Sequence, residues 1–181
     1  MFDIVDLPDA AALARLAQRY PQLETPALQT WLGLMRVSDD CQNDLDRFLA
    51  THGLTQRKFF VLILLFRNPD GLLVSQLAKG TGVSCATMTG VVDGLHKAQL
   101  VTREPHEQDR RACTVSMTPS GQQLLDQVLP QHYRRVSRIM ACLGPSERQQ
   151  LQALLGKISA SVQDLSSFHA EEGEPNESCH L

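Results

Sequence analysis

The chain has 181 residues, and 43% of them are hydrophobic, which is enough to form the core of one ordinary domain. No run approaches the roughly 18 uninterrupted apolar residues of a membrane span, and the first residues lack the basic flank of a signal peptide. We therefore expect a cytoplasmic protein without a membrane partner. The five cysteines are scattered, with no Cys-x-x-Cys pair, which disfavours a disulfide scaffold or a structural zinc site.

The net charge of −3 is unevenly distributed along the chain. Residues 1–10 hold three acidic and no basic residues, and residues 169–181 hold four acidic and no basic ones. Residues 11–168 therefore contain 13 acidic and 17 basic residues, a charge of +4, which suits an anionic partner such as DNA. The segment 169–181, rich in glutamate, is predicted to be a disordered acidic tail.

Helices are predicted for the first third of the chain. Residues 9–19 are strong helix formers, and we assign residues 1–26 to an N-terminal helical extension. A long helix follows from about Pro26 to Ala50, with apolar residues three or four apart on one face. Thr55 is placed to cap the next helix.

Two short helices joined by a tight turn are predicted after the short extended piece at residues 72–74. Ser75 is expected to cap the first, which closes at Gly80, and residues 81–82 make the turn. Ser84 is expected to cap the second helix, which reaches about Ala98. This arrangement is a helix-turn-helix.

A β-hairpin is predicted after the helix-turn-helix. The β-rich segments 101–103 and 112–117 flank a polar loop from Glu104 to Arg111, and apolar residues alternate along the second segment. Such a hairpin forms a wing. Thr118-Pro119 then begins another helix, and a final helix after residues 144–145 carries an apolar stripe from Leu151 to Leu165.

The first long helix and the last helix are each too apolar for a solitary surface helix. They flank the helix-turn-helix from both ends of the chain, and a two-fold DNA site needs two recognition helices about one helical turn apart. We therefore predict that the two helices build a homodimer interface. Packing within a single chain is the alternative that the sequence leaves open.

The second helix of the helix-turn-helix has two different faces. A helical wheel places Met88 and Leu95 on the core side, whereas Thr89, Gly90 and Asp93 face the other way. Small and hydroxyl-bearing side chains approach base edges closely, and the helix N-terminus at a capping serine suits a phosphate. This face is the predicted DNA-reading surface, and an exposed face of small residues without a function is the alternative.

The predicted tip of the wing carries two adjacent arginines, Arg110 and Arg111. Their weakly hydrated guanidinium groups suit the narrow, electronegative minor groove. Asp109 is interpreted as structural, because a carboxylate two residues earlier can hold the Arg111 guanidinium extended. Arg103 and His106 are expected to contact phosphates rather than bases.

The run from Gly82 to Leu95, followed by Leu100-Val101-Thr102-Arg103 and by Asp109-Arg110-Arg111, resembles the MarR family of transcriptional regulators. The resemblance covers roughly residues 27–168. It implies a mainly α fold with a small β-hairpin wing, a winged helix-turn-helix flanked by dimerisation helices. It also implies a regulator, most simply a repressor, that binds a pseudo-palindromic double-stranded operator as a homodimer, with neither catalysis nor a cofactor.

The predicted DNA contacts combine the helix-turn-helix and the wing. They are Ser75, Ser84, Ala86, Thr87, Thr89, Gly90, Asp93, Arg103, His106, Arg110 and Arg111. Relatives often carry a basic residue at the position of Gly90, so this chain departs from the family pattern in its recognition helix.

The resemblance further implies control by a small-molecule effector, such as an aromatic carboxylate or a phenol, bound between the dimerisation helices and the DNA-binding lobe. The predicted lining supplies aromatic rings and a cation. The residues are Trp31, Met35, Arg36, Phe59, Phe60, His132 and Tyr133. For any single aromatic residue in this set, a plain core role is the competing interpretation.

Two other functions are alternatives to this one. The six histidines show neither the spacing of a helical metal pair nor an accompanying nucleophile motif, which disfavours an enzyme. A thiol-based redox-sensing repressor of the same fold is the stronger alternative, with Cys41, Cys85 and Cys113 as candidates. Cys85 is best placed, because the dipole at the first turn of a helix favours a thiolate.

Overall fold

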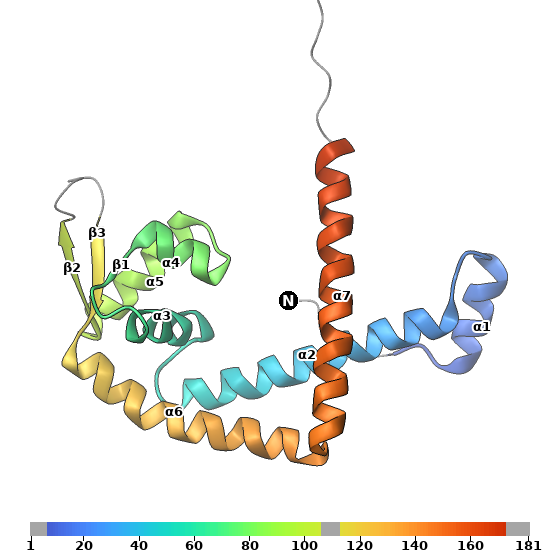
Figure 1. The fold of residues 1–181 in the computed structure, drawn as a ribbon, viewed down its shortest axis with the longest axis horizontal. Helices are drawn as coiled ribbons and strands as arrows, with labels where there is room; N and C mark the ends of the chain where they lie inside the picture. The colour runs from blue at the N-terminus through green and yellow to red at the C-terminus, as the bar shows by residue number, and fades with distance from the viewer. Residues whose placement is uncertain (1–6, 106–112, 173–181) are drawn as a thin grey trace, which may run out of the picture. The chain divides into compact units, whose positions relative to one another are not determined.

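The computed structural model describes residues 7–105 and 113–172, with side chains through Leu165. The chain divides after Val128 into two compact units, here called the N-terminal and C-terminal units, and each is described by itself. The elements, shown in Figure 1, are α1 (Ala10–Arg19), α2 (Thr25–Ala50), α3 (Gln56–Phe66), β1 (Leu72–Leu73), α4 (Val74–Thr81), α5 (Cys85–Lys97), β2 (Val101–Pro105), β3 (Cys113–Met117), α6 (Pro119–Ile139), a 3₁₀ turn (Met140–Cys142) and α7 (Pro145–Glu172).

Helices α1 and α2 confirm the two helices predicted before residue 51. Asp9 caps α1 by accepting a hydrogen bond of 2.6 Å from the backbone N–H of Ala12, and Leu13 is the buried residue of this helix. Helix α2 is buried only near its end, at Phe48 and Leu49. Gly53, with a φ of +69°, ends the turn that follows α2, in a conformation that residues with a Cβ rarely adopt.

Helix α3 is the centre of the N-terminal unit. The Thr55 hydroxyl accepts a hydrogen bond from the Lys58 N–H, which confirms the predicted cap. Leu54 and Phe59, which flank this cap, are both buried, so the chain enters the helix at a fixed angle. Phe59, Val61, Leu62 and Leu65 form the core contribution of α3.

Helices α4 and α5 form the predicted helix-turn-helix, with Gly82 at the turn in a left-handed conformation of φ +68°. Ser84 caps α5, as predicted, by accepting a hydrogen bond from the Thr87 N–H. The predicted cap of α4 is wrong. The helix begins at Val74, so Ser75 lies within its first turn, and the Gln76 side chain accepts from the Leu73 N–H instead.

The sheet has three antiparallel strands in the order β1-β3-β2. The two longer strands form the predicted hairpin, with Val101 opposite Met117 and Pro105 opposite Cys113. The short extended piece becomes β1, which pairs Leu72 with Val115. Helix α5 contacts β2, and α3 contacts both α5 and β3. Leu77, Met88, Leu95 and Val115 are fully buried, and they complete one apolar core around α3.

The start of α6 is joined tightly to the loop before β2. The Thr118 hydroxyl donates a 2.8 Å hydrogen bond to the Gln99 carbonyl and accepts one from the Gly121 N–H. A Cβ at position 121 would collide with the carbonyl oxygen of Leu100. Because α6 approaches the backbone this closely, only glycine fits here. Gly121, Leu125 and Val128 then form the buried stripe of α6.

The C-terminal unit consists of the remainder of α6, the 3₁₀ turn and α7. The Glu147 carboxylate caps α7 by accepting a 2.7 Å hydrogen bond from the Gly144 N–H. Every described side chain of α7 is exposed in the single chain, including the predicted apolar stripe. The helix continues through residues 169–172, which the sequence had assigned to the acidic tail. None of the helices in the described ranges is both long and apolar enough to cross a membrane.

Candidate nucleic-acid interface

Helix α5 has one buried and one exposed side, as the helical wheel predicts. Met88, Val92 and Leu95 are fully buried against the core of the N-terminal unit. The opposite side carries small or short polar side chains over its first turns and Lys97 at its end. Its exposed residues are Ala86, Thr87, Thr89, Gly90 and Lys97.

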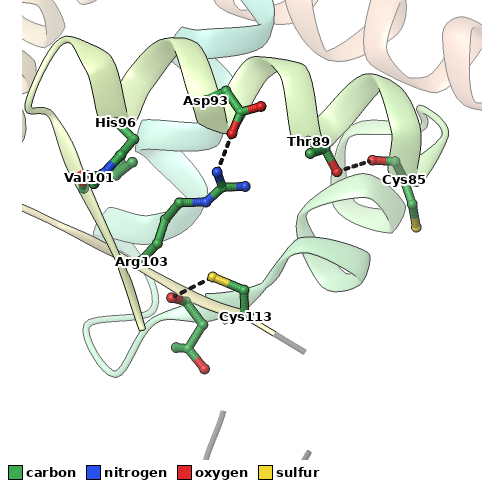
Figure 2. Close-up of polar contacts among 8 residues, drawn as sticks. Cys85, Thr89, Asp93, His96, Val101, Arg103 and Cys113 are labelled. Carbon is green, nitrogen blue, oxygen red and sulfur yellow. Dashed lines mark hydrogen bonds and ion pairs between the residues drawn. The ribbon is translucent and has the colours of Figure 1, made fainter. Parts of the chain in front are cut away.

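The N-terminal end of α5 presents a cluster of hydroxyl groups. The oxygens of Ser84 and Thr87 lie 3.0 Å apart and share a hydrogen bond, and the Ser84 oxygen also accepts from the Thr87 N–H. Thr89 donates its hydroxyl proton to the Cys85 carbonyl at 2.9 Å (Figure 2). Its remaining lone pairs and its methyl group are the features available to a DNA base.

Gly90 opens a gap in the middle of this side. A Cβ built at this position meets no heavy atom within 4 Å. The gap therefore allows the α5 backbone to approach a base pair or phosphate closely. No basic side chain stands at this position, and the lysine on the same side of α5 is Lys97, in its last turn.

Asp93 and Arg103 form an ion pair between α5 and β2, and Figure 2 shows the two side chains pointing toward each other. The side chain of Arg103 is 25% exposed and that of Asp93 is 47% exposed. The sequence predicts that both residues contact DNA, and this stays a prediction; in the structure the Asp93 carboxylate accepts from one terminal N–H of Arg103, whose Nε is buried without a partner among the described residues. The pair links β2 to α5.

A second link between α5 and the wing runs through His96. Its Nδ1 lies 3.1 Å from the carbonyl oxygen of Val101, the first residue of β2 (Figure 2). Gln99, with a φ of +59°, makes the tight turn between the two elements. The orientation of β2 is therefore set by two polar contacts in addition to the core.

Lys58 is a candidate residue that the sequence reading missed. It is a half-buried residue of α3, and its stem lies over α5 at Gly94, where a Cβ would be 3.1 Å from Cε and 3.4 Å from Nζ of the lysine. Within the described part of the chain its ammonium group forms no ion pair. Only the packing of α3 on α5 reveals this cation. The glycine at 94 was the only local signal for it.

The four predicted residues of the wing tip, His106, Asp109, Arg110 and Arg111, lie outside the described residues. The flanking strands are described, and their register brings Pro105 opposite Cys113 on either side of this segment. Ser75, also predicted to contact DNA, is exposed in the first turn of α4. Its side chain is thus available to a partner even though it does not cap the helix.

The predicted effector residues of the N-terminal unit differ in accessibility. Trp31 is 49% exposed and Phe60 is 43% exposed, whereas Phe59 is fully buried and belongs to the core. Met35 is half-buried and Arg36 is exposed. Trp31 and Phe60 are therefore each accessible at the surface of this unit, whereas the Phe59 ring is not.

The remaining two effector candidates lie in the C-terminal unit. His132 and Tyr133 are neighbours on α6, with ring centroids 5.9 Å apart. Tyr133 is exposed and His132 is half-buried. Burial, together with the positive charge of Arg135, lowers the pKa of His132 below its usual value of 6.5. This histidine is therefore biased toward its neutral form.

The cysteines weighed for redox sensing are free thiols. Cys41 and Cys85 are exposed and Cys113 is half-buried. Cys85 is the first residue of α5, and the thiol of Cys113 donates a weak hydrogen bond to the Thr114 carbonyl at 3.7 Å (Figure 2). Across residues 7–105 and 113–172, no group of three or more potential metal-ligating side chains comes together.

Comparisons with known proteins agree with this geometry. The model of the MarR family matches residues 54–113, which run from the cap of α3 to the start of β3. The HTH-type transcriptional repressor YetL of Bacillus subtilis is 30% identical over 157 residues, covering 86% of this chain and 94% of YetL.

Two solved structures extend the comparison to the fold. AbsC, a MarR family transcriptional regulator from Streptomyces coelicolor, superposes with a TM-score of 0.71 at 26% identity, covering 78% of this chain and 97% of AbsC. CouR from Rhodococcus jostii RHA1, solved with p-coumaroyl-CoA bound, gives a TM-score of 0.60 at 25% identity, covering 69% of this chain and 87% of CouR. The chain therefore belongs to the MarR family of transcriptional regulators.

Proposed function

We propose that this protein is a ligand-responsive transcriptional repressor that binds a pseudo-palindromic operator as a homodimer. A small aromatic carboxylate or phenol releases it from the DNA. The observation that carries the proposal is the exposed side of α5, made of small and hydroxyl-bearing residues and joined to the wing by the Asp93–Arg103 ion pair. A protein with this role works where the chromosome is, so we keep the cytoplasm as its expected location.

In this proposal α5 enters the major groove. Thr87, Thr89 and Gly90 face the base edges, while Ser84 and the first N–H groups of the helix bind a phosphate. Lys58 supplies the positive charge that α5 lacks beside Gly94, and it binds the phosphate backbone. Arg110 and Arg111 of the wing are proposed to enter the adjacent minor groove.

The homodimer is supported by the exposure of α7. Six apolar side chains lie on one face of this helix and are 36% to 62% exposed in the single chain, namely Leu151, Leu154, Leu155, Ile158, Val162 and Leu165. A continuous apolar face of this length is typical of a protein interface. A second copy of α7 has the same stripe, so a two-fold symmetric contact would cover both.

The aromatic effector is supported by the chemistry of exposed rings and by one relative. Trp31, Phe60 and Tyr133 are all exposed, and CouR was solved with p-coumaroyl-CoA, an aromatic thioester. An effector drives release only if it binds the DNA-incompetent conformation more tightly than the competent one. A tenfold loss of operator affinity needs about 1.4 kcal/mol of such coupling.

The test begins by selecting operators from a random double-stranded DNA pool with the full-length protein. We expect a site with two-fold symmetry and half-site centres about 10 base pairs apart, because two recognition helices must enter successive major grooves. Affinity should fall linearly with salt on logarithmic axes. Recovery of no enriched sequence, or binding without salt dependence, would falsify the proposal.

The wing is tested on the selected operator with Arg111→Ala. We expect a loss of about 1 to 3 kcal/mol in binding free energy, because one arginine contact in a groove is removed while the dimer is retained. Arg19→Ala, an exposed arginine on α1 far from the wing in sequence, is the matched control and should leave affinity unchanged. Equal affinities for the two variants would remove the wing from the interface.

A thiol-based redox sensor is the second candidate, because Cys85 is exposed at the first residue of the proposed recognition helix. Oxidation there would place a bulky polar group against the DNA. Peroxide should then release the wild-type protein but not Cys85→Ser. If peroxide releases the protein in this Cys85-dependent way and no aromatic acid or phenol does, the redox mechanism replaces the effector mechanism.

A further inference from the structure

We propose that a groove within the N-terminal unit binds a small aromatic carboxylate, and that this groove is where an effector acts on the recognition helix. The inference rests on the proposed function, which it deepens by naming the site. The groove has a volume of about 700 Å³, within the range of small-molecule sites. It lies between α3 and the turn that joins α4 to α5. Its lining is Gln56, Arg57, Phe60, Ile63, Leu64, Arg67, Gly80, Thr81 and Val83.

The wall formed by α3 has an apolar centre with a cation at each end. Arg57, Phe60, Leu64 and Arg67 are spaced by three and four residues, so they follow one face of the helix. Both arginines are exposed, and among the described residues neither forms an ion pair. An aromatic ring on Phe60 and Leu64 would therefore place its carboxylate next to a guanidinium group.

The spacing of the two arginines limits the size of the ligand. They are ten positions apart, which is about 15 Å along the helix axis. A molecule with one ring and one carboxylate is too short to reach both, so it would pair with one arginine while its ring covers the apolar centre. Guanidinium binds a carboxylate through two parallel hydrogen bonds, which favours an acid over a neutral phenol or amide.

The opposite wall is formed by α4 and the turn that follows it, and the other polar side chains of the lining are Thr81 and, on α3, Gln56. Gly80 lets α4 approach Leu64 closely, because a Cβ at this position would lie 3.0 Å from the Leu64 Cδ1 atom. The Thr81 hydroxyl is already bonded to the Leu77 carbonyl at 2.8 Å. Gln56 donates its side-chain N–H to the Gln42 carbonyl at 3.1 Å. The Gln56 side chain keeps its oxygen and its second N–H, and the two arginines are the cations of the lining.

The groove is connected directly to the recognition helix. Val83 lines it and immediately precedes Ser84, the cap of α5. A ring inserted between α3 and this turn would displace the N-terminal end of α5 from its position on the core. Ligand and operator would then favour different positions of α5, so each would weaken the binding of the other by the same factor. This site shares only Phe60 with the effector set predicted from the resemblance.

The experiment measures binding of cinnamate to the full-length protein by calorimetry without DNA, with neutral cinnamamide as the matched ligand. We expect cinnamate to bind at least tenfold more tightly than cinnamamide. The double variant Arg57→Gln, Arg67→Gln should lose at least tenfold in cinnamate affinity, since both ends of the groove lose their charge. Arg19→Gln should retain wild-type affinity, because Arg19 lies on α1 outside the groove.

The readouts separate this inference from the proposed function. Failure of operator selection would contradict the regulator while leaving the calorimetric result on the groove intact. The groove assignment is overturned if cinnamate does not bind at millimolar concentration, or if the double variant binds it as wild type does. It is also overturned if Trp31→Ala abolishes binding and the double variant does not, because the ligand would then occupy the site predicted between the lobes.

Discussion

In the N-terminal unit one apolar face each of α3, α4 and α5 is buried, as at Phe59, Leu77 and Met88, whereas in the C-terminal unit every described side chain of α7 is exposed. Both units carry clear helical stripes of apolar residues. In the first, the stripes face one another and form a core without a buried polar side chain among the described residues. In the second, the apolar stripe is exposed in the single chain. The same sequence pattern therefore corresponds to a core in one place and, in our proposal, to an interface between two copies in the other.

The largest effect on stability is expected from a mutation in the core of the N-terminal unit. Phe59→Ala should lower the free energy of unfolding by about 3 to 5 kcal/mol, because it leaves a large cavity around a fully buried ring. Urea denaturation measures this loss of unfolding free energy. Phe66→Ala is the matched control on the same helix, where the ring is 49% exposed, and it should cost under about 1 kcal/mol. Similar losses in both variants would mean that α3 is not the centre of the core.

A charge on the α7 stripe tests the other half of the comparison. Leu154→Lys with Ile158→Lys should dissociate the dimer, because two cations per chain would be forced into an apolar contact. Light scattering should then report about the mass of one chain, 20.1 kDa, in place of twice that value. Gln149→Lys with Ala160→Lys, on the opposite face of α7, should leave the dimer intact. A wild-type protein that is already monomeric would refute the interface.

A smaller effect, on operator affinity, should show whether Lys58 acts through its surface charge or only through packing in the N-terminal unit. Lys58→Gln should weaken operator binding several-fold and reduce the slope of log affinity against log salt by about 1, because one phosphate contact is lost. Lys157→Gln, an exposed lysine on α7, is the control and should leave the slope unchanged. An unaltered slope in Lys58→Gln would show that this lysine serves packing on Gly94 alone.

The smallest expected effect is a pH dependence in the C-terminal unit. Because the pKa of His132 is lowered in the folded chain, protonation favours the unfolded state. The resulting loss of folding stability is absent well above pH 6.5 and grows as the pH falls from about 6.5 through the lowered pKa. The melting temperature should therefore drop more between pH 7.5 and 5.5 for the wild type than for His132→Gln. An identical drop in both proteins would assign the pH dependence to other groups.

The sequence predicts local structure well, because a cap or turn depends on residues a few positions apart. Thr55, Ser84 and Thr118 all cap the helices that the sequence assigned to them. Ser75 fails because β1 pairs with β3, far along the chain, and runs directly into α4. The helical wheel places Asp93 correctly away from the core, but only the strand that follows reveals Arg103 as its partner.

The features missed in the candidate sites share a physical cause. Lys58 reaches Gly94, and the groove between α3 and the turn after α4 exists, because helices distant in sequence pack at a particular angle. Periodicity identifies which side of a helix is apolar, and it does not fix how far two helices approach. Gly80 and Gly94 mark such close approaches, and a glycine in the interior of a helix was the one sequence signal available.

The close junction at Gly121 has a mechanical consequence for how the protein responds to a ligand. The start of α6 packs against the Leu100 carbonyl, and Thr118 is hydrogen-bonded to the Gln99 carbonyl. We therefore expect the start of α6 and the base of the wing to move together. The buried stripe of α6 ends at Val128, and Pro130 lacks the N–H that would bond to the Asp126 carbonyl. We therefore expect the fulcrum of any bending to lie near residues 128–130. Because the start of α6 and the wing move together, a small rotation at these residues would displace the wing by a larger distance.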